Sequence, residues 1–484
     1  MVPVSAPHMT VSEVRLYERP TRLRLPFKFG VVTLTETPQA FARVRITRAD
    51  GSDAWGQAAE LMVPKWFDKD PALTNDQNVA QLRDALALTA EAYRTAGQTT
   101  AFGLFADQYE DLLAAGAARG LNPLAMSFGP ALLDRAVLDA LCRLDDLSFA
   151  QAVRANLPGI DTRPPVSALD GFPMDRFLAG LKPAPHIHAR HTVGMVDPLT
   201  AADQAPGARL DDGLPETLEE VIAAYGHRYV KIKVRGDTAA DLDRLTAIAR
   251  VLDTLDDPYF VTLDGNEQFD DVDGILDLLG ALEARADLKR FTNAILFVEQ
   301  PIKRARALAV DVSALARKRP VIVDESDGTL EAFVTARGRG YAGVSSKSCK
   351  GFYKSLINAA RCAAWNAEGG GDGNGRFFLS GEDLTCQAGV AVQQDLALVG
   401  LLGLGHVERN GHHYVKGMAG APEAERATFL GAHPTLYRLV GDQTCLRIEG
   451  GRIALRDINT CPGYGAGAEP DWGALSPMAV NQGS

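Results

Sequence analysis

Apolar and polar residues alternate near the start of the chain, at residues 11–17 and again at residues 42–46. Alternation with a period of two is typical of strands that bury one face. Over residues 75–118 and 130–155, apolar residues instead recur at the three- and four-residue spacing of amphipathic helices. The pattern therefore predicts an α+β unit, a small antiparallel sheet followed by helices, within residues 1–165.

From residue 186 onward the pattern changes to short apolar runs separated by amphipathic helices, which is typical of βα units. The expected strands cover residues 186–191, 229–234, 259–263, 295–298, 321–323, 341–345, 377–380 and 405–408. The expected helices between them include residues 239–255, 272–284, 351–368 and 388–402. Eight strands at this spacing match one parallel barrel, because parallel strands need crossover connections.

No helix is expected directly after the eighth strand, so the barrel is predicted to be of the (β/α)7β type, within residues 185–430. Residues 431–484 return to short alternating runs and end in a tail rich in Gly and Pro. We expect this last segment to rejoin the N-terminal unit. The predicted fold class is thus α/β, a TIM-like barrel with a second, α+β unit.

Composition and charge argue against two classes of protein, nucleic-acid-binding proteins and membrane proteins. The 484 residues include 50 Lys and Arg against 61 Asp and Glu, and the resulting net charge of −11 argues against a nucleic-acid partner. A mean hydropathy of −0.07, with no run of about 18 apolar residues, argues against a membrane protein. The six cysteines form no CxxC pair, and the first thirty residues lack the pattern of a secretory signal. We expect reduced thiols and a cytoplasmic location.

The expected barrel strands end in charged residues, and the C-terminal strand ends are where catalytic groups of such barrels lie. The second to sixth strands end, in order, in Lys231-Ile232-Lys233, Asp264, Glu299, Asp324-Glu325 and Lys347. Three neighbouring carboxylates would point oxygen ligands at one centre, as Mg2+ requires, and a divalent cation would keep all three ionised. For any one of these acids alone, a solvent-exposed loop residue is the alternative.

Lys231 and Lys233 are two positions apart on one strand, so both side chains project to the same side of the sheet. Inside a barrel, like charge and desolvation would lower the pKa of a lysine toward a value at which it can act as a base. The alternative for this motif alone is a pair of exposed lysines on a strand edge.

Five motifs together resemble the enolase superfamily, in particular the muconate-lactonizing-enzyme-like subgroup of its mandelate racemase/muconate lactonizing enzyme family. They are KIKV at 231–234, LDGNEQF at 263–269, VEQP at 298–301, VDES at 323–326 and SSKSCKG at 345–351. The resemblance spans the barrel, about half of the chain. Residues 1–165 and the C-terminal return resemble the capping domain of that superfamily.

The resemblance implies a role for each of these strand-end residues. The Mg2+ ligands would be Asp264, Glu299 and Asp324, the acid/base residues Lys233 and Lys347 on opposite faces of the substrate, and the residue beside the substrate carboxylate Lys231. Lys231 would also lower the pKa of Lys233. Glu325 is the alternative to Asp324 as ligand, because strand alternation lets only one of the two face inward. Asn266 would contact the metal's surroundings or the substrate.

The activity implied by the resemblance is Mg2+-dependent abstraction of the proton α to a carboxylate, giving a metal-stabilised enediolate. Such an enzyme would be an isomerase or lyase, that is a racemase or epimerase, a dehydratase or a cycloisomerase. We expect a small-molecule carboxylate as substrate, a homo-oligomer, and neither nucleic acid nor membrane as partner. Two alternatives stay open, a catalytically silent metal- or ligand-binding member of the same fold and a divalent-metal aldolase on a barrel.

Some features depart from the family pattern. The stretch 286–294 lengthens the connection between the third and fourth strands, and the segment KSCKGFYKS offers Lys350 and Lys354 as competitors of Lys347. Glu382 and Asp383, after the seventh strand, could meet a cationic substrate group, or form a helix cap and pair with Arg409.

Aromatic and histidine residues complete the candidates. Segments 27–30 and 64–67 are expected to lie over the barrel mouth, with Trp66 as the best single candidate for substrate contact and core packing as its alternative. On the first strand His186 and His188 share a face that His191 does not. The neighbours His412 and His413 are expected to lie in a polar loop, with a pair of metal ligands as the alternative, because adjacent histidines do not easily face one centre.

Overall fold

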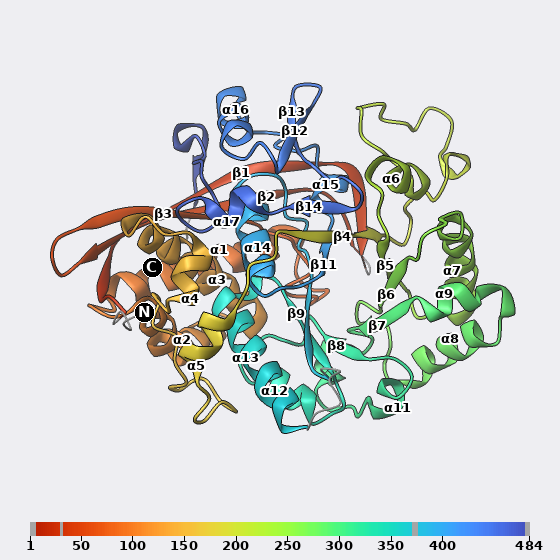
Figure 1. Ribbon diagram of the computed structural model, residues 1–484, viewed down its shortest axis with the longest axis horizontal. Coiled ribbons are helices and arrows are strands. Elements are labelled where there is room, and N and C mark those ends of the chain that lie inside the picture. The colour runs from red at the N-terminus through yellow and green to blue at the C-terminus, as the bar shows by residue number, and fades with distance from the viewer. Residues whose placement is uncertain (1–5, 30–31, 370–375, 480–484) are drawn as a thin grey trace.

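A computed structural model describes residues 6–29, 32–369 and 376–479 of the chain, and the two predicted parts lie side by side in it (Figure 1). The first part contains an antiparallel sheet in the order β15-β1-β2-β3. Its strands are β1 (Met9–Phe29), β2 (Val32–Arg48), β3 (Asp53–Leu61) and β15 (Ser476–Pro477). Because β15 pairs with β1, the C-terminal segment returns to the N-terminal sheet.

Five helices follow this sheet, and side-chain caps decide where several of them begin. They are α1 (Asn75–Thr95), α2 (Ala101–Ala118), α3 (Pro123–Leu144), α4 (Phe149–Arg154) and α5 (Met174–Gly180). The expected helical stretch 75–118 is split because Thr100 accepts a hydrogen bond from the backbone of Gly103 and starts a new helix. Helix α3 begins seven residues before the expected position, because Asn122 caps it and Pro123 occupies its first turn.

The second part is a closed barrel of eight parallel strands, which confirms the predicted fold class. The strands are β4 (His186–Val193), β5 (Tyr229–Lys233), β6 (Phe260–Asp264), β7 (Ile295–Glu299), β8 (Val321–Val323), β9 (Gly343–Ser346), β10 (Phe378–Gly381) and β11 (His406–Arg409). Pairing of β11 with β4 closes the barrel, with His406 opposite His188. Each observed strand begins or ends within two residues of its predicted position, because buried parallel strands form short apolar runs.

Helices and short turns connect and cover these strands. They are η1 (Ala201–Asp203), α6 (Leu218–Tyr225), α7 (Thr238–Leu252), α8 (Asp273–Glu283), η2 (Ala286–Leu288), α9 (Lys289–Asn293), α10 (Arg304–Ala307), α11 (Ser313–Ala316), α12 (Ala332–Arg337), η3 (Ser348–Lys350), α13 (Phe352–Glu368), α14 (Val390–Leu401), α15 (Gly411–Tyr414), α16 (Glu423–Ala432), α17 (Arg456–Thr460) and η4 (Trp472–Ala474). Elements η2 and α9 form the extra segment predicted at 286–294.

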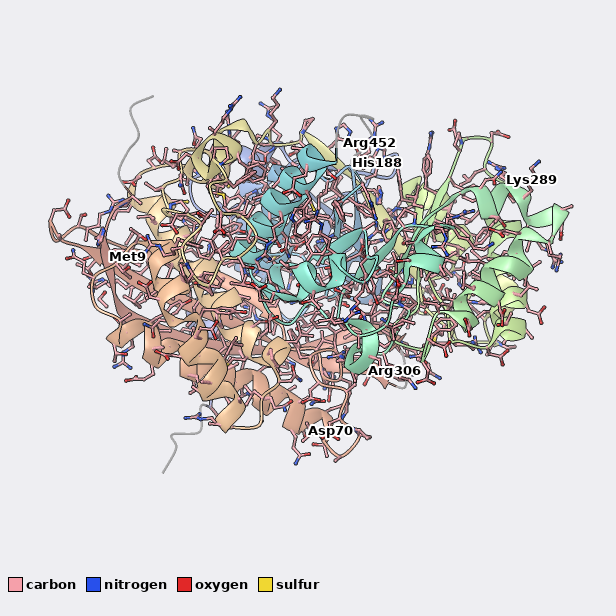
Figure 2. All side chains as sticks on the ribbon, turned by 90° about the horizontal axis from the view of Figure 1, so that it is seen from below. Met9, Asp70, His188, Lys289, Arg306 and Arg452 are labelled. Carbon is pink, nitrogen blue, oxygen red and sulfur yellow. The ribbon has the colours of Figure 1, made fainter. Side chains whose placement is uncertain are left out.

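Two further features fix the C-terminal part of the chain. The hairpin β12 (Tyr437–Val440) and β13 (Gln443–Leu446) forms a separate antiparallel pair. The strand β14 (Arg452–Ala454) then adds to the outside of β4, so that Arg452 and His188 lie next to one another in Figure 2. No helix in the described ranges is long and apolar enough to cross a membrane.

The hydrophobic core ties the two parts together. One cluster of buried side chains runs from the N-terminal helices into the barrel and includes Leu132 of α3, Phe352 of α13 and Leu398 of α14. A second cluster fills the space between the barrel strands and α7 and α8, with Leu263 and Leu278 among its members. The continuous first cluster holds the N-terminal part against the strand ends that carry the charged residues.

Candidate active site

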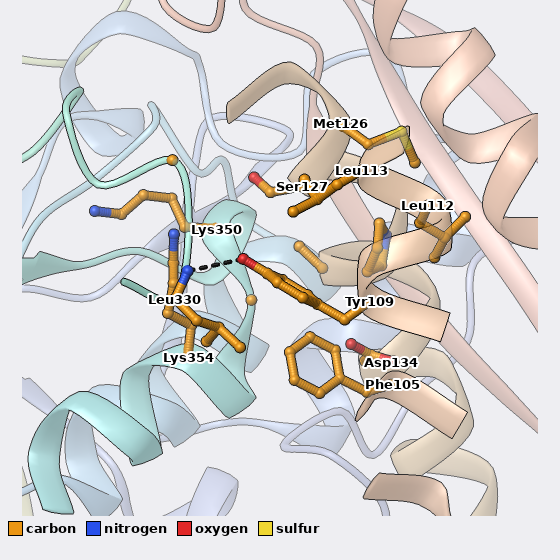
Figure 3. A pocket seen from close by; sticks show the side chains of 14 residues that line it. Phe105, Tyr109, Leu112, Leu113, Met126, Ser127, Asp134, Leu330, Lys350 and Lys354 are labelled. Atoms are coloured by element: carbon orange, nitrogen blue, oxygen red, sulfur yellow. Dashed lines mark hydrogen bonds between the residues drawn. The ribbon is translucent and has the colours of Figure 1, made fainter. Parts of the chain in front are cut away.

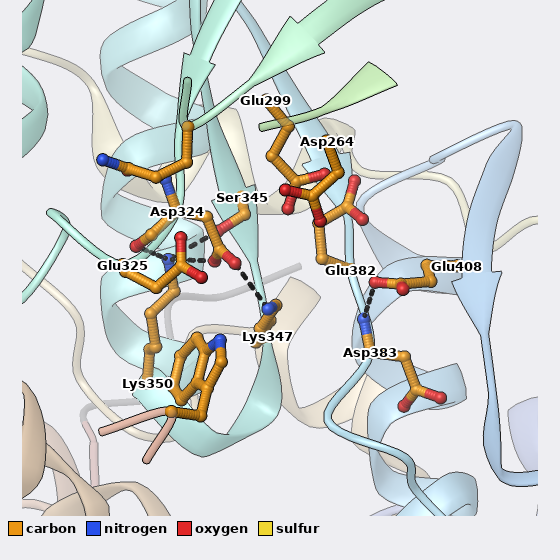
Figure 4. Close-up of polar contacts among 12 residues, drawn as sticks. Asp264, Glu299, Asp324, Glu325, Ser345, Lys347, Lys350, Glu382, Asp383 and Glu408 are labelled. Carbon is orange, nitrogen blue, oxygen red and sulfur yellow. Dashed lines mark hydrogen bonds and ion pairs between the residues drawn. The ribbon is translucent and has the colours of Figure 1, made fainter. Parts of the chain in front are cut away.

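The charged strand ends predicted from the sequence meet in the barrel, and the carboxylates of Asp264, Glu299 and Glu382 point toward one another (Figure 4). Neighbouring strands present them in register, with Lys233 opposite Asp264 and Asp264 opposite Glu299. Every one of these side chains is at most 9% exposed. The barrel therefore concentrates many ionisable groups in a place that water barely reaches.

Lys231 lies at the centre of this cluster. Its Nζ is 2.8 Å from an oxygen of Glu299, 2.9 Å from Glu382, and 3.0 Å from both Glu408 and Asp264. Burial alone would lower the pKa of Lys231, but these four carboxylates outweigh burial and hold it well above its ordinary value. The expectation that burial and like charge lower the pKa of this pair is thus wrong for Lys231.

Lys233 and Lys347 lie on opposite sides of the barrel, because β5 and β9 are four strands apart in a closed ring of eight. Nζ of Lys233 is 2.6 Å from Oδ2 of Asp264, and Nζ of Lys347 is 2.6 Å from Oδ2 of Asp324. Burial opposes the charged form of Lys347, but Asp324 raises the pKa of its ammonium above the ordinary value. Each lysine is therefore positioned by a different aspartate.

Asp324 and Glu325 are both buried but point to different partners. Asp324 accepts hydrogen bonds from Ser345 and Lys347, and although burial opposes its ionisation, the lysines hold its pKa well below its usual range. Glu325 accepts a hydrogen bond of 3.1 Å from the side chain of Asn266, and burial and the charge of Asp324 raise its pKa to about 7. Asp324 is the one that faces Lys347.

A small cavity of about 30 Å3 opens among these groups, at the junction of the barrel and the N-terminal part. Trp66 covers it, with the Nζ of Lys347 at 4.3 Å from the centre of the indole ring. Phe27 belongs to β1 rather than to a loop, and Gly30 of the same expected segment lies outside the described residues. The lining residues are Phe27, Val63, Trp66, Lys231, Lys233, Asn266, Asp324, Lys347, Asp383, Leu384, Thr385, Glu408 and Asn410.

Glu382 and Asp383, the candidates after the seventh strand, already have partners within the chain. Glu382 is fully buried and contacts Lys231, Arg190 and the hydroxyl of Ser380. Asp383 accepts hydrogen bonds from the backbone of Cys386 and Asn410 and lies 3.7 Å from Arg409. Both acids therefore order the loops around the cavity.

Sequence reasoning gave no role to Glu408 and Arg190, which complete the cluster. Glu408 contacts Lys231 and accepts a hydrogen bond of 2.6 Å from Thr192. Arg190 shares its strand face with His188, and in the structure its side chain lies inside the barrel, against Ser380 and Glu382. The sequence did not show which charged residues Glu408 and Arg190 would contact, because those residues come from distant strands.

Lys350 and Lys354, the competitors of Lys347, lie at a different cavity, between α2, α3 and α13 (Figure 3). Lys350 donates a hydrogen bond of 2.9 Å to Asp327, and Lys354 donates one to the backbone oxygen of the same residue. Only Lys347, of these three, lines the cavity with Lys231 and Lys233. Nζ of Lys350 lies 3.6 Å from Oδ1 of Asp324, so Lys350 also lies near the cluster, but position 347 is the one of the three that faces the cavity.

The N-terminal part also supports the turn that follows Lys347. Arg135 of α3 pairs with Glu60 of β3 at 3.0 Å, and both side chains are fully buried. Glu60 also accepts a hydrogen bond of 3.1 Å from the hydroxyl of Ser348. A buried pair thus connects the N-terminal sheet to the residue next to a predicted catalytic lysine.

The carboxylate cluster fits a divalent cation of the Mg2+ class. Burial and the nearby charges of Asp264 and Glu382 raise the pKa of Glu299 well above its usual range. Oδ1 of Asn266 and Oε2 of Glu325 are buried and accept no hydrogen bond in the described part of the chain. Oxygen donors without partners and an excess of carboxylates are what a hard cation requires.

Most of the histidines in the barrel lie in one of two places. His406 and His188 belong to the barrel wall, where Arg190 lies 2.6 Å from Nδ1 of His406. His412 and His413 are buried on the short helix α15, so the expectation of a polar loop is wrong. His191, on the other face of β4 as predicted, lies against both of them.

Comparisons with known proteins agree with this architecture. A family model described as enolase C-terminal domain-like matches residues 213–472, more than half of the chain. A search among curated proteins finds no match.

Solved structures with the same fold are distant in sequence. One is the L-Ala-D/L-Glu epimerase from Bacillus subtilis, with 16% identity, a TM-score of 0.56, and 95% of this chain and 98% of that chain covered. A dipeptide epimerase from Cytophaga hutchinsonii, complexed with Mg and D-Ala-L-Val, has 15% identity, a TM-score of 0.58 and coverage of 98% and 100%. The 2-chloromuconate cycloisomerase from Rhodococcus opacus 1CP has 16% identity, a TM-score of 0.57 and coverage of 96% and 98%. At this identity they establish a shared fold.

Proposed function

The chain belongs to the enolase superfamily, and from this premise we propose that it is a Mg2+-dependent racemase or epimerase that moves the proton α to a carboxylate. The observation that carries the proposal is the placement of two lysines, Lys233 and Lys347, on opposite strands around one cavity. A base on each face of a substrate carbon is what inversion of that carbon needs, since one face loses the proton and the other gains it.

The proposed metal ligands are Asp264, Glu299 and Asp324, whose strands are consecutive in the barrel. When bound, Mg2+ supplies the stabilisation of negative charge that makes a proton next to a carboxylate acidic enough to remove. Lys231 would face the substrate carboxylate from the cavity wall, because it lines the cavity and its raised pKa keeps it an ammonium.

Each lysine would transfer a proton to or from its own face of the substrate α-carbon. One Nζ, as a free amine, accepts the α-proton, while the other, as an ammonium, delivers a proton to the opposite face. Trp66 stabilises the ammonium form of Lys347 through its ring and covers the cavity. Phe27 and Val63 add apolar walls, and excluding water strengthens every charge interaction inside.

The names of the structural relatives suggest the first substrates to test. Among them are epimerases for dipeptides and a cycloisomerase for 2-chloromuconate. Dipeptides and N-acyl amino acids carry an acidic α-carbon next to a carboxylate or amide, so they fit a site that inverts one carbon. Acid sugars extend the panel to hydroxyl-bearing carboxylates.

Incubation of the full-length protein with Mg2+ in D2O tests the proposal. Deuterium should enter the α-position of both stereoisomers of the true substrate, as seen by proton NMR. Exchange in only one stereoisomer, with a new product, would favour a lyase or cycloisomerase instead. Mg2+ binding without any exchange across the panel would favour a catalytically silent protein, and cleavage of a carbon–carbon bond would favour an aldolase.

A further inference from the structure

Four histidines gather on the outer side of the barrel, away from the carboxylate cluster. His191 comes from β4, His227 from the connection between α6 and β5, and His412 and His413 from α15. Their side chains are between 0 and 9% exposed. None of the four lines the cavity that contains Lys233 and Lys347. The group is therefore a second, separate concentration of ligating side chains.

The ring nitrogens converge. One nitrogen each from His191, His227 and His412 lies within 4.8 Å of the other two. The ring of His413 has its centre 4.9 Å from that of His191. A tetrahedral ion with metal–nitrogen bonds of about 2.0–2.1 Å keeps its ligand nitrogens roughly 3.4 Å apart, so small side-chain rotations would bring the three rings to a shared ion.

These nitrogens lack the partners that buried polar atoms normally have. Within residues 6–29, 32–369 and 376–479, no hydrogen bond reaches Nδ1 of His191, Nε2 of His227, either nitrogen of His412, or Nδ1 of His413. Several unpaired, buried ring nitrogens at one point need an explanation, because burying a polar group without a partner is unfavourable.

His227 is oriented as a metal-binding histidine would be. Its Nδ1 lies 2.9 Å from the backbone oxygen of Ala189 and donates a hydrogen bond to it, which leaves the lone pair of Nε2 free. Burial lowers the pKa of His227 to about 4 and that of His413 to about 3, so both rings are neutral near pH 7, the form that binds metals.

We propose that His191, His227 and His412 bind one divalent transition-metal ion of the Zn2+ class, with His413 as the candidate fourth ligand. Imidazole nitrogens favour such ions, whereas Mg2+ favours the oxygen ligands of the carboxylate cluster. The surrounding charge allows a cation, because Arg24 is paired with Asp212 at 2.8 Å and Arg409 is paired with Asp395. Since the ligands are buried, the site is structural.

The ion would fasten α15 to the first barrel strand and so position a wall of the active-site cavity. Asn410 directly precedes α15 and lines that cavity. Its backbone N–H donates a hydrogen bond of 2.7 Å to Asp383, and its side chain donates one of 2.9 Å to Glu408. Asn410 is thus a positioning residue that the metal would hold through the helix next to it.

Titration of the purified, metal-free full-length protein with Co2+ tests the site. A large excess of Mg2+ in the buffer keeps the carboxylate cluster occupied, so failure of the catalytic proposal does not affect the result. We expect one equivalent of Co2+ to produce the intense visible absorption of a tetrahedral nitrogen site, and Zn2+ to displace it. X-ray absorption of the Zn2+ form should show three or four imidazole nitrogens, a measurement that needs no variant.

The variants His227→Asn and His412→Asn should lose the Co2+ absorption, while His186→Asn, on the same strand as His191 but outside the cluster, should keep it. Zn2+ should also raise the Tm of the wild type and not that of His412→Asn. Absence of a one-to-one tetrahedral Co2+ spectrum in the wild type would overturn the proposal. So would a spectrum that persists in the double variant His227→Asn/His412→Asn.

Discussion

The ammonium of Lys347 lies 4.3 Å from the centre of the Trp66 ring, so a residue from the N-terminal part contacts a lysine of the barrel directly. Trp66 is 5% exposed and packs edge-on against Phe67 at 4.8 Å. The indole is therefore held in place by its own neighbours and does not depend on substrate for its position. The cavity beside Lys347 is formed jointly by the two parts of the molecule.

Replacing Trp66 with Leu should reduce turnover by about tenfold, because a desolvated cation–π contact is worth about 1–2 kcal/mol. Water admitted beside Lys347 would add to this loss. The rate of α-deuterium exchange measures the reduction in turnover. Trp55→Leu is the matched control, since Trp55 contacts Arg15 and Arg43 on the outer sheet and not the barrel. Equal losses in both variants would contradict a specific role for Trp66.

Lys233→Ala and Lys347→Ala should each abolish exchange of a different stereoisomer. Removing a general acid or base lowers the rate by about 100- to 10,000-fold, and each lysine serves only the face of the substrate on its own side. Proton NMR in D2O with the separate stereoisomers makes the measurement. Lys303→Ala, which removes an exposed partner of Asp270, is the control. Unchanged exchange of both stereoisomers in Lys233→Ala would disprove its assigned role.

Glu299→Gln should weaken Mg2+ binding by at least tenfold and remove α-proton exchange, because it takes one negative charge from the proposed ligand set. Isothermal titration with Mg2+ gives the affinity, and treatment with EDTA should silence the wild type reversibly. Glu283→Gln, at the exposed end of α8, should bind Mg2+ like the wild type. Wild-type affinity in Glu299→Gln would remove this residue from the ligand set.

Much of this arrangement could be predicted from the sequence, because a parallel barrel leaves little choice. Strands buried on both faces form short apolar runs, and their C-terminal ends must meet at one rim. The period of two placed Lys231 and Lys233 on the same side, and both now contact Oδ2 of Asp264. These conclusions needed only local pattern and topology.

The rest depends on contacts between distant parts of the chain. The pKa of Lys231 is raised because strands β6, β7, β10 and β11 each bring a carboxylate to it, and local sequence does not reveal that number. The histidine cluster joins the first strand, the connection before the second strand and the turn after the eighth. Those segments become neighbours only because β11 pairs with β4 to close the barrel.

Lowering the pH should destabilise the protein partly through His406. Burial and the charge of Arg190 lower the pKa of His406 to about 3, while an unfolded histidine titrates near pH 6.5. Between these values the unfolded chain binds the extra proton, so the free energy of unfolding falls as the pH falls. At about pH 4.5 the titration of His406 alone should make the free energy of unfolding about 2 kcal/mol lower than at pH 7.

His406→Gln keeps an acceptor for Arg190 but cannot titrate, so its loss of stability between about pH 7 and pH 4.5 should be smaller than that of the wild type by a similar amount. Urea unfolding at the two pH values provides the comparison. His8→Gln, which changes an exposed side chain, should behave like the wild type. Parallel pH dependences for His406→Gln and the wild type would mean that His406 does not contribute.

Gly56→Ala should strongly destabilise the N-terminal part, because strand β3 approaches helix α3 backbone to backbone at this position. A Cβ on Gly56 would lie 2.0 Å from the carbonyl oxygen of Ala136 and 2.3 Å from the backbone nitrogen of Ala140. Neither atom can move without displacing α3, so we expect a loss of about 3 kcal/mol or more in the free energy of unfolding.

Gly280→Ala is the matched control, since that glycine lies in α8 with no atom within 4 Å of an added Cβ. Alanine there should stabilise the helix by up to about 1 kcal/mol. Because α3 also carries Arg135, the partner of Glu60 beside Ser348, Gly56→Ala should lower α-proton exchange as well, whereas Gly280→Ala should not. A Gly56→Ala protein with wild-type stability would show that β3 and α3 are not in close contact.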